Sequence, residues 1–408
     1  MPERVETVVI GAGQAGLAMS RELAERGCEH VVLERARVAE RWRTQRWDSL
    51  RFQFPNWSIE LPGARYDGDD PEGFAPRDAI VAWLERYRGS IGAPVRTNVD
   101  VLSLAAARGD RYLLRTSRGD LEARNVVVAT GPYQRPRVPA MAASLPGDIA
   151  QVHAGDYTRP AALPDGAVLV IGTGASGCQI AEELLEAGRE VVLAVGRHRR
   201  VPRRYRGRDV FWWRRELGQL DVRAEDVAPE QRPPPPLVTG VHGGHEIDLR
   251  AYAARGMRLV GHVVGVSDRI LALAADLHAH LDAGDRACDA FKAEADAFVA
   301  RHGLDLPQEP ATAPPRGVRS PATLDRLDLD RAGIRAIVWA TGYTTDFRWI
   351  GLPIVDEHGG ARHRRGTSEA NGVSFLGLPW LATAKSSFLC GVGADAAHLA
   401  ERIAARDG

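Results

Sequence analysis

The sequence predicts an α/β fold with two doubly wound domains, because one local pattern occurs twice. Near residue 5 and again near residue 168, an apolar strand leads into a glycine-rich turn, a helix and a second apolar strand. Gly172 opens the second turn 161 residues after Gly11 opens the first, which is too long for a solenoid repeat and suits two similar domains. The length of 408 residues allows two or three domains of ordinary size.

The first pattern consists of a strand over 5–10, a helix to about residue 27 and a strand over 30–33. An irregular stretch rich in Trp and Arg follows over 41–64, where prolines and a glycine interrupt any regular element. The remaining elements predicted for this half are an amphipathic helix over 78–88 and strands over 95–104, 112–116 and 125–129.

The second pattern consists of a strand over 168–171, a helix to about residue 188 and a strand over 190–195. Four consecutive prolines at 233–236 predict a loop. The other elements predicted here are a helix over 276–302 interrupted at Gly284, a proline-rich connector over 307–321, strands over 335–340 and 373–376, and a closing helix over 391–405.

The first turn has the composition of a dinucleotide-binding turn, with the sequence Gly11-Ala12-Gly13-Gln14-Ala15-Gly16. Its first glycine permits the tight turn, the second lets the backbone approach a pyrophosphate, and the third lets the helix pack closely on the strand. The following helix start adds N–H donors and a positive dipole. Glu34, at the end of the next strand, is placed to accept hydrogen bonds from ribose hydroxyls.

The second turn repeats the glycine pattern but lacks the acidic residue at the ribose end. It reads Gly172-Thr173-Gly174-Ala175-Ser176-Gly177. After its second strand come Arg197, Arg199 and Arg200, whose guanidinium groups would pair with a 2′-phosphate that a carboxylate would repel. The second site is therefore expected to prefer NADPH to NADH, with Arg197 as the main phosphate ligand. A solvated arginine loop is the alternative, and the same two possibilities stay open for Arg203, Arg204, Arg206 and Arg208.

Two turns that differ at the ribose end imply two different nucleotides, and FAD is expected in the first because it stays bound while the nicotinamide nucleotide exchanges. Here the sequence resembles the flavin-containing monooxygenase family, to which YUCCA-type enzymes and Baeyer–Villiger monooxygenases are related. The resemblance rests on the two turns, on Trp42, and on the strand ends Ala129-Thr130-Gly131 and Ala340-Thr341-Gly342-Tyr343. The expected FAD contacts also include Arg35, Arg41, Val99 and Leu389.

Three positions depart from the family pattern. Where the family commonly has Gly-Gly-x-Trp, this chain has Ala39-Glu40-Arg41-Trp42. The monooxygenase fingerprint Phe-x-Gly-x-x-x-His is matched only at its end, by His153, because Gly147 and Ile149 stand at the Phe and Gly positions. The flavin-facing Asn of many members falls on Gln53, which has the same amide on a longer side chain.

The resemblance implies a monooxygenase in which NADPH reduces FAD, oxygen forms a C4a-hydroperoxyflavin, and one oxygen atom passes to an amine, a sulfide or a carbonyl compound. The expected partners are thus a small-molecule substrate and molecular oxygen. Gln53 and Lys385 are the candidate catalytic residues, near the flavin ring and the start of the closing helix. An NADPH-dependent reductase that serves a quinone or another acceptor, and a non-catalytic NADPH-sensing module, are the alternatives.

The nucleotide assignments give expected domain boundaries. An FAD-binding domain over 1–160 and 331–408 would be interrupted by an NADPH-binding domain with a helical insertion over 161–330. Both domains are expected to be Rossmann-like.

Composition argues against several other functions. Lys+Arg and Asp+Glu both number 53, which gives no reason to expect nucleic acid or an anionic membrane as a partner. No apolar run approaches the roughly 20 residues of a membrane span, and no signal-peptide pattern is present, so we expect a cytoplasmic location. The oligomeric state stays open.

Metal and disulfide chemistry are not expected either. The four cysteines are far apart in the sequence. We expect the pairs His242/His245 and His278/His280 to have no acidic or Cys partner at ligand spacing, so no metal is expected. Phe211-Trp212-Trp213 is interpreted as core more readily than as a substrate entrance.

Overall fold

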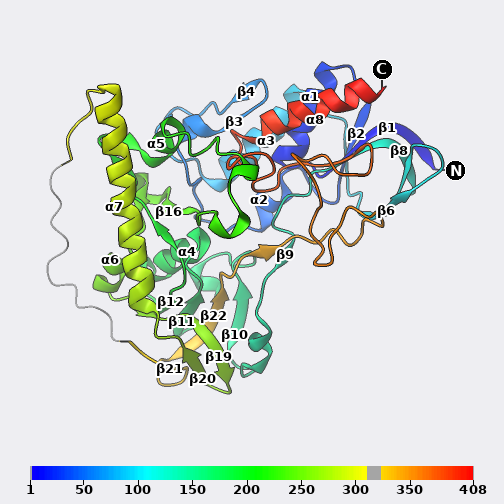
Figure 1. Cartoon of the computed structure of the whole chain (residues 1–408). Coiled ribbons are helices and arrows are strands. Elements are labelled where there is room, and N and C mark those ends of the chain that lie inside the picture. The colour runs from blue at the N-terminus through cyan, green and yellow to red at the C-terminus, as the bar shows by residue number, and fades with distance from the viewer. Residues whose placement is uncertain (1, 310–322, 408) are drawn as a thin grey trace.

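A computed structural model describes residues 2–309 and 323–407 of the chain. It confirms the α/β class, with a seven-stranded sheet in one half of the molecule and a five-stranded sheet in the other (Figure 1). The proline-rich connector predicted over 307–321 lies mostly outside the described residues. Within the described part of the chain, every helix is too short or too polar to cross a bilayer.

The first sheet has a parallel centre that contains the predicted strand–turn–helix unit. In spatial order its strands are β5 (Val95–Thr97), β2 (His30–Glu34), β1 (Glu3–Ile10), β8 (Leu121–Val128), β7 (Tyr112–Thr116) and β6 (Val101–Ala106), and β24 (Val373–Phe375) pairs with β8. The helices of this half are α1 (Gln14–Glu25), α2 (Glu40–Thr44), α3 (Arg77–Ser90) and α8 (Val392–Asp407). Figure 1 shows α1 and α8 side by side, and both bury apolar residues in the same core.

The second sheet is parallel throughout. Its strands in spatial order are β10 (Ala150–His153), β22 (Ile334–Trp339), β11 (Ala167–Ile171), β12 (Val191–Ala194) and β18 (Arg258–Val260). The helices of this half are α4 (Ala175–Glu186), α5 (Val210–Glu216), α6 (Leu249–Ala254) and the long α7 (Leu277–His302), which stands along one side of the molecule in Figure 1.

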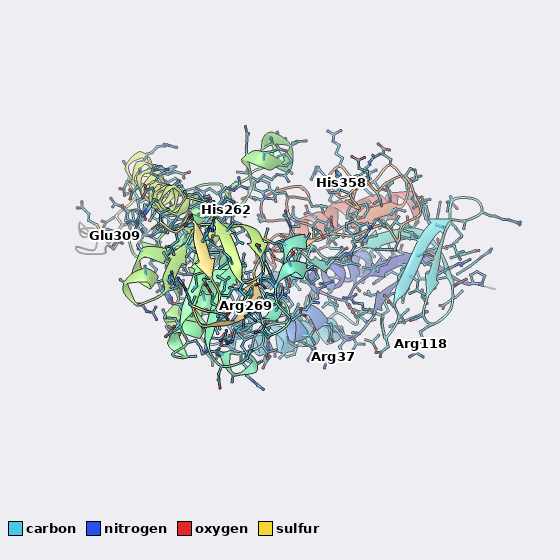
Figure 2. All side chains as sticks on the ribbon, turned by 90° about the horizontal axis from the view of Figure 1, so that it is seen from below. Arg37, Arg118, His262, Arg269, Glu309 and His358 are labelled. Carbon is cyan, nitrogen blue, oxygen red and sulfur yellow. The ribbon has the colours of Figure 1, made fainter. Side chains whose placement is uncertain are left out.

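Short strands complete the structure around the two main sheets. They form the groups β13 (Arg199–Arg200), β16 (Pro236–Thr239) and β17 (His245–Glu246); β19 (Val263–Ser267), β20 (Ile270–Leu273) and β21 (Arg326–Asp328); β3 (Glu60–Leu61) and β4 (Ala64–Arg65); β14 (Arg204–Tyr205) and β15 (Arg208–Asp209); and β9 (Arg135–Pro136) and β23 (Tyr343–Thr344). Side chains project around the whole outline in Figure 2, where the labelled Arg37 and Arg118 belong to the half with the first sheet.

The strand pairing differs from the expected domain boundaries. The first domain was expected to hold residues up to 160 and from 331 onward, yet β10 and β22 both pair within the second sheet. The reason is that β22 lies between β10 and β11, so the chain leaves the first sheet before residue 150 and pairs with it again only after β22, first through an isolated bridge between Ile350 and Leu104 and then at β24. By strand pairing, the chain passes between the two sheets before β10 and after β22, whereas the expected boundaries are at 160 and 331.

Three smaller predictions need correction. The strand predicted over 95–104 is two strands, β5 and β6, because Asn98 between them has φ of 57° in the left-handed region. Pro236 begins β16 instead of ending a loop. Gly284 does not interrupt α7, and its lack of a side chain serves packing, because a Cβ there would lie 2.6 Å from Nε2 of His198.

Candidate functional site

Both glycine-rich turns open onto one cavity of about 1260 Å³. The cavity runs from Gly11 and Gly13 of the first turn to Gly174 and Ser176 of the second. A single space of this size that borders two such turns can hold large ligands from both halves of the molecule.

Close backbone packing explains why each turn begins with glycine. Gly11 and Gly172 have φ of 108° and 114°, backbone conformations that residues with a side chain rarely adopt. A Cβ on Gly11 would lie 2.7 Å from the carbonyl oxygen of Ala129, and one on Gly172 would lie 2.5 Å from that of Ala340. The strand ends that carry Ala129-Thr130-Gly131 and Ala340-Thr341-Gly342 therefore lie directly behind the two turns.

The other glycines of the turns divide into packing and open positions. A Cβ on Gly16 or Gly177 would overlap the carbonyl oxygen of the first glycine in its own turn, so these residues let the helix approach the strand. At Gly13 and Gly174 a Cβ would meet no atom within 4 Å. Gly13 and Gly174 are therefore open to the cavity, beside the starts of α1 and α4. A phosphate there would accept hydrogen bonds from backbone N–H groups.

Glu34 is held at the edge of the first turn by backbone hydrogen bonds. Its Oε2 accepts from the Ala12 N–H at 2.8 Å and its Oε1 from the Ala36 N–H at 3.0 Å. The side chain is buried but lines the cavity. Each carboxylate oxygen keeps a further lone pair that can accept from a ribose hydroxyl.

The C-terminal segment is fixed against the first turn. The Gln14 amide donates to the carbonyl oxygen of Ser387 at 2.7 Å, and Leu389 two residues later lines the same cavity. Ala39, which also lines the cavity, adopts φ of 58°, a left-handed conformation that glycine adopts more readily than alanine.

The cavity gathers most of the residues proposed from the sequence. Those that line it are Gly11, Gly13, Gln14, Ala15, Glu34, Arg35, Arg41, Trp42, Gln53, Val99, Ala129, Thr130, Gly131, Gly174, Ala175, Ser176, Gly177, Arg199, Ala340, Gly342 and Leu389. Those that do not line it are Gly16, Gly172, Arg197, Thr341 and Lys385.

The arginines after β12 have different environments. Arg197 is exposed and forms no ion pair with any described residue. Arg199 lines the cavity. Arg200 is bound by the carboxylates of Glu246, Asp248 and Asp285 at 2.7–2.8 Å, so it is not free to assist a phosphate.

The later arginines are engaged within the protein. Arg203 is buried and pairs with Asp209 at 2.7 Å, and Arg206 pairs with Asp296 at 2.6 Å. Arg204 lies 3.4 Å from the carbonyl oxygen of Gly243, and Arg208 lies over the ring of Trp212.

The two candidate catalytic residues differ in their position relative to the cavity. Gln53 lines the cavity, and its amide donates to the carbonyl oxygen of Pro236 at 2.9 Å. Lys385 lies outside the cavity lining and pairs with Asp221 at 2.7 Å. This placement does not favour the predicted role of Lys385 in the site, because its ammonium is used in a partly exposed ion pair.

His153, the part of the fingerprint that this chain retains, links the end of β10 to the segment that follows β22. Its Nδ1 accepts from the Gly155 N–H at 3.1 Å, so its Nε2 carries the proton and donates to the Gly342 carbonyl oxygen at 3.0 Å. Burial lowers the pKa of His153, which keeps the ring neutral. The ring also packs edge-on against Tyr343.

Sequence reasoning missed Arg46 and Tyr133 as cavity residues. The guanidinium of Arg46 lies over the rings of Trp42 and Tyr133, at 5.6 and 5.1 Å from their centroids. Trp42 lies in α2 and Arg46 is four residues further along the chain, whereas Tyr133 is distant in the sequence, so no local signal pointed to the contact between Arg46 and Tyr133.

The histidine pairs also require a correction. His280 lies 3.0 Å from Oδ2 of Asp276, four residues earlier, and His262 contacts the same oxygen, so an acidic partner does stand at ligand spacing (His262 is labelled in Figure 2). The three groups already satisfy one another by hydrogen bonds.

Phe211 and Trp213 are fully buried core residues, as interpreted from the sequence.

Known proteins resemble this chain along its whole length. Residues 8–208 match the family model described as pyridine nucleotide-disulphide oxidoreductase. An "uncharacterized oxidoreductase CzcO-like" of Geobacillus kaustophilus is 31% identical over 406 residues, covering 99% of both chains. The indole-3-pyruvate monooxygenase YUCCA1 of Oryza sativa is 33% identical over 202 residues, which are 47% of this chain and 49% of that one.

The fold has a matching solved structure. The flavin-containing monooxygenase from Stenotrophomonas maltophilia superposes with a TM-score of 0.69 at 20% identity, covering 100% of both chains. Together with the two glycine-rich turns and their shared cavity, these similarities confirm the predicted resemblance to flavin-containing monooxygenases and the predicted cofactors, FAD and NADPH. The chain belongs to the family of the CzcO-like oxidoreductases, and it shares its fold with the flavin-containing monooxygenase from Stenotrophomonas maltophilia.

Proposed function

We propose that this oxidoreductase is a monooxygenase that inserts one oxygen atom into a small organic substrate, at a nitrogen, a sulfur or a carbonyl group. In balance, substrate, O₂, NADPH and H⁺ give oxygenated substrate, NADP⁺ and water. The flavin would supply the oxygen-activating chemistry as a C4a-hydroperoxyflavin. The main support is the one cavity that borders both turns and extends to the aromatic side chains of Phe54 and Phe388.

The protein's own residues would bind, orient and exclude water. Glu34 and the open face at Gly13 would hold the ribose and pyrophosphate of FAD, while Gly174 and Arg197 would hold NADPH. Gln53 keeps a free amide oxygen in the cavity after its N–H group has bonded to Pro236. It would position groups at the flavin through that amide, and the apolar walls would limit the access of water.

A disulfide reductase is a poor fit despite the name of the matching family model. Its chemistry needs a redox-active thiol next to the flavin. The four cysteines are unpaired, and none of them lines the cavity. Burial raises the pKa of Cys178 and Cys390, which makes both thiols less reactive.

Product analysis would test the proposed function. The FAD-loaded protein is supplied with NADPH and ¹⁸O₂ and a panel of amines, sulfides and ketones, while NADPH oxidation and hydrogen peroxide are followed together. A monooxygenase transfers ¹⁸O to a substrate with little peroxide. NADPH oxidation with complete conversion of O₂ to peroxide for every compound would favour the reductase, and absence of flavin reduction would favour the NADPH-sensing module.

Gln53→Ala and Lys385→Met make a matched pair in the same assay. We expect Gln53→Ala to oxidise NADPH while releasing several-fold more peroxide, because an amide beside the reacting centre is lost. Lys385→Met should retain wild-type coupling, since its ammonium pairs with Asp221. Wild-type coupling in Gln53→Ala would remove Gln53 from the site.

A further inference from the structure

Two arginines reach the cavity without an anionic partner. Arg214 of α5 is 7% exposed, and its Nε and Nη1 have no hydrogen-bond partner within the described part of the chain. Arg199 of β13 also lines the cavity, and its hydrogen bond is a long one of 3.4 Å to Oε1 of Gln219. Neither guanidinium forms an ion pair with a described residue, unlike Arg200 and Arg203 beside them.

Such an arrangement is unfavourable without a ligand. The pKa of Arg214 is lowered to about 10. Burial is the main cause, and the nearby positive charge of Arg199 is the second. Burial also lowers the pKa of Arg199. A guanidinium group stays protonated in proteins at neutral pH, so two like charges share a poorly solvated space. A buried charge without a counter-ion destabilises a protein, which makes this pair a candidate for anion binding.

The surroundings of Arg214 are aromatic. The ring centroid of Phe388 lies 5.9 Å from the guanidinium carbon of Arg214 and 5.7 Å from the ring of Phe54. Phe54 packs in turn on the buried Phe211 at 4.4 Å. Phe54 and Phe388 line the cavity together with the two arginines. The site thus combines a cationic end with an adjacent apolar wall.

We propose that Arg199 and Arg214 bind the carboxylate of an organic-acid substrate, whose apolar body packs against Phe54 and Phe388. A planar guanidinium pairs with a carboxylate through two parallel hydrogen bonds, and a second guanidinium can bind the same group from another side. The inference rests on the proposed function and specifies its substrate class. The 2′-phosphate of NADPH is the competing anion, but Arg197, exposed on the loop after β12, remains available for it.

Binding can be measured without turnover, so its result is separate from that of the proposed function. The FAD-loaded protein is titrated with phenylacetate and with 2-phenylacetamide, its neutral isostere, and the change in the flavin absorption spectrum gives each Kd. We expect phenylacetate to bind at least tenfold more tightly than the amide. Equal affinities in the wild-type protein would overturn the proposal.

Two neighbouring arginines supply the variant and its control. Arg214→Met should abolish the preference for the carboxylate, and Arg214→Lys should keep part of it. Arg215→Met should retain the full preference, because the Arg215 side chain is 50% exposed and pairs with Glu216 at 3.1 Å. The melting temperature of Arg214→Met should equal or exceed that of the wild type, since an unpaired buried charge is removed. A lower melting temperature together with an unchanged carboxylate preference would assign Arg214 a structural role and overturn the proposal.

Titration with nucleotides distinguishes the two anions. Arg214→Met should leave the Kd of NADPH within twofold of the wild-type value. A tenfold weaker affinity for NADPH with unchanged affinity for NADH would place the 2′-phosphate at Arg214 and would also overturn the proposal.

Discussion

The two glycine-rich turns have nearly the same backbone but different ribose ends. In both, the first glycine packs on a carbonyl oxygen of a neighbouring strand end, the second is open to the cavity, and the third lets the helix approach. At the end of β2, the buried Glu34 accepts a hydrogen bond from the N–H group of Ala12 in the turn. After β12, the exposed Arg197 occupies the corresponding region. The turn geometry therefore provides for a dinucleotide, and we expect the residues at the end of the second strand to select which one.

The largest effect is expected from blocking the open glycine of one turn at a time. Gly13→Val should abolish FAD binding, because the added side chain occupies the place of the pyrophosphate. Gly174→Val should keep FAD but lose reduction by NADPH. Flavin absorbance of the purified protein and anaerobic reduction by NADPH report the two outcomes.

The packing glycines provide the control for this experiment. Gly16→Ala and Gly177→Ala should destabilise the fold, since a Cβ at either position overlaps a backbone oxygen. Gly13→Val should fold, because no protein atom lies within 4 Å of its Cβ position. Retention of full FAD content by Gly13→Val would contradict the assignment of the first turn.

A smaller effect is expected at the ribose end of the second site. Arg197→Ala should weaken NADPH binding about tenfold or more, because a charge-assisted contact is worth roughly 1.5–3 kcal/mol, and should leave NADH nearly unchanged. Arg200→Ala should instead lower stability without changing selectivity, since three carboxylates hold Arg200. Equal losses of NADPH and NADH in Arg197→Ala would indicate a structural role.

The smallest effect concerns two histidines that contact the helices after the turns. The Glu182 carboxylate on α4 hydrogen-bonds to His245 and raises the pKa of His245 above its usual 6.5. Its stabilising contribution is full below pH 6.5 and is lost as the pH rises through the folded-state pKa. His245→Gln should thus cost about 0.5 kcal/mol at pH 6, the range of a partly exposed ion pair, and less at pH 8.5.

His30, which contacts Ser20 on α1, should show the opposite sign. Burial lowers the pKa of His30 below 6.5, so its contribution is present above pH 6.5 and is lost as the pH falls through the lowered value. His30→Gln should therefore cost more at pH 8.5 than at pH 5.5. Urea unfolding of both variants across this range checks the two signs, and parallel pH profiles would contradict the comparison.

The sequence by itself determined the fold class, the two dinucleotide turns and the acidic and basic ribose ends. These features depend on local rules, because a strand, a turn with fixed glycine roles and a helix occupy about thirty consecutive residues. Gly11, Gly13 and Glu34 could be assigned without any knowledge of distant contacts.

The tertiary structure decided what depends on residues far apart in the chain. Sequence spacing could not show that β22 lies between β10 and β11, or that Asp221 pairs with Lys385 while Gln53 lines the cavity. Nor could it distinguish Arg200, which three carboxylates neutralise, from Arg214, which lines the cavity and has no carboxylate partner among residues 2–309 and 323–407. Strand order and the pairing of charges are set by packing between distant segments, and one arginine is locally indistinguishable from another until its neighbours are known.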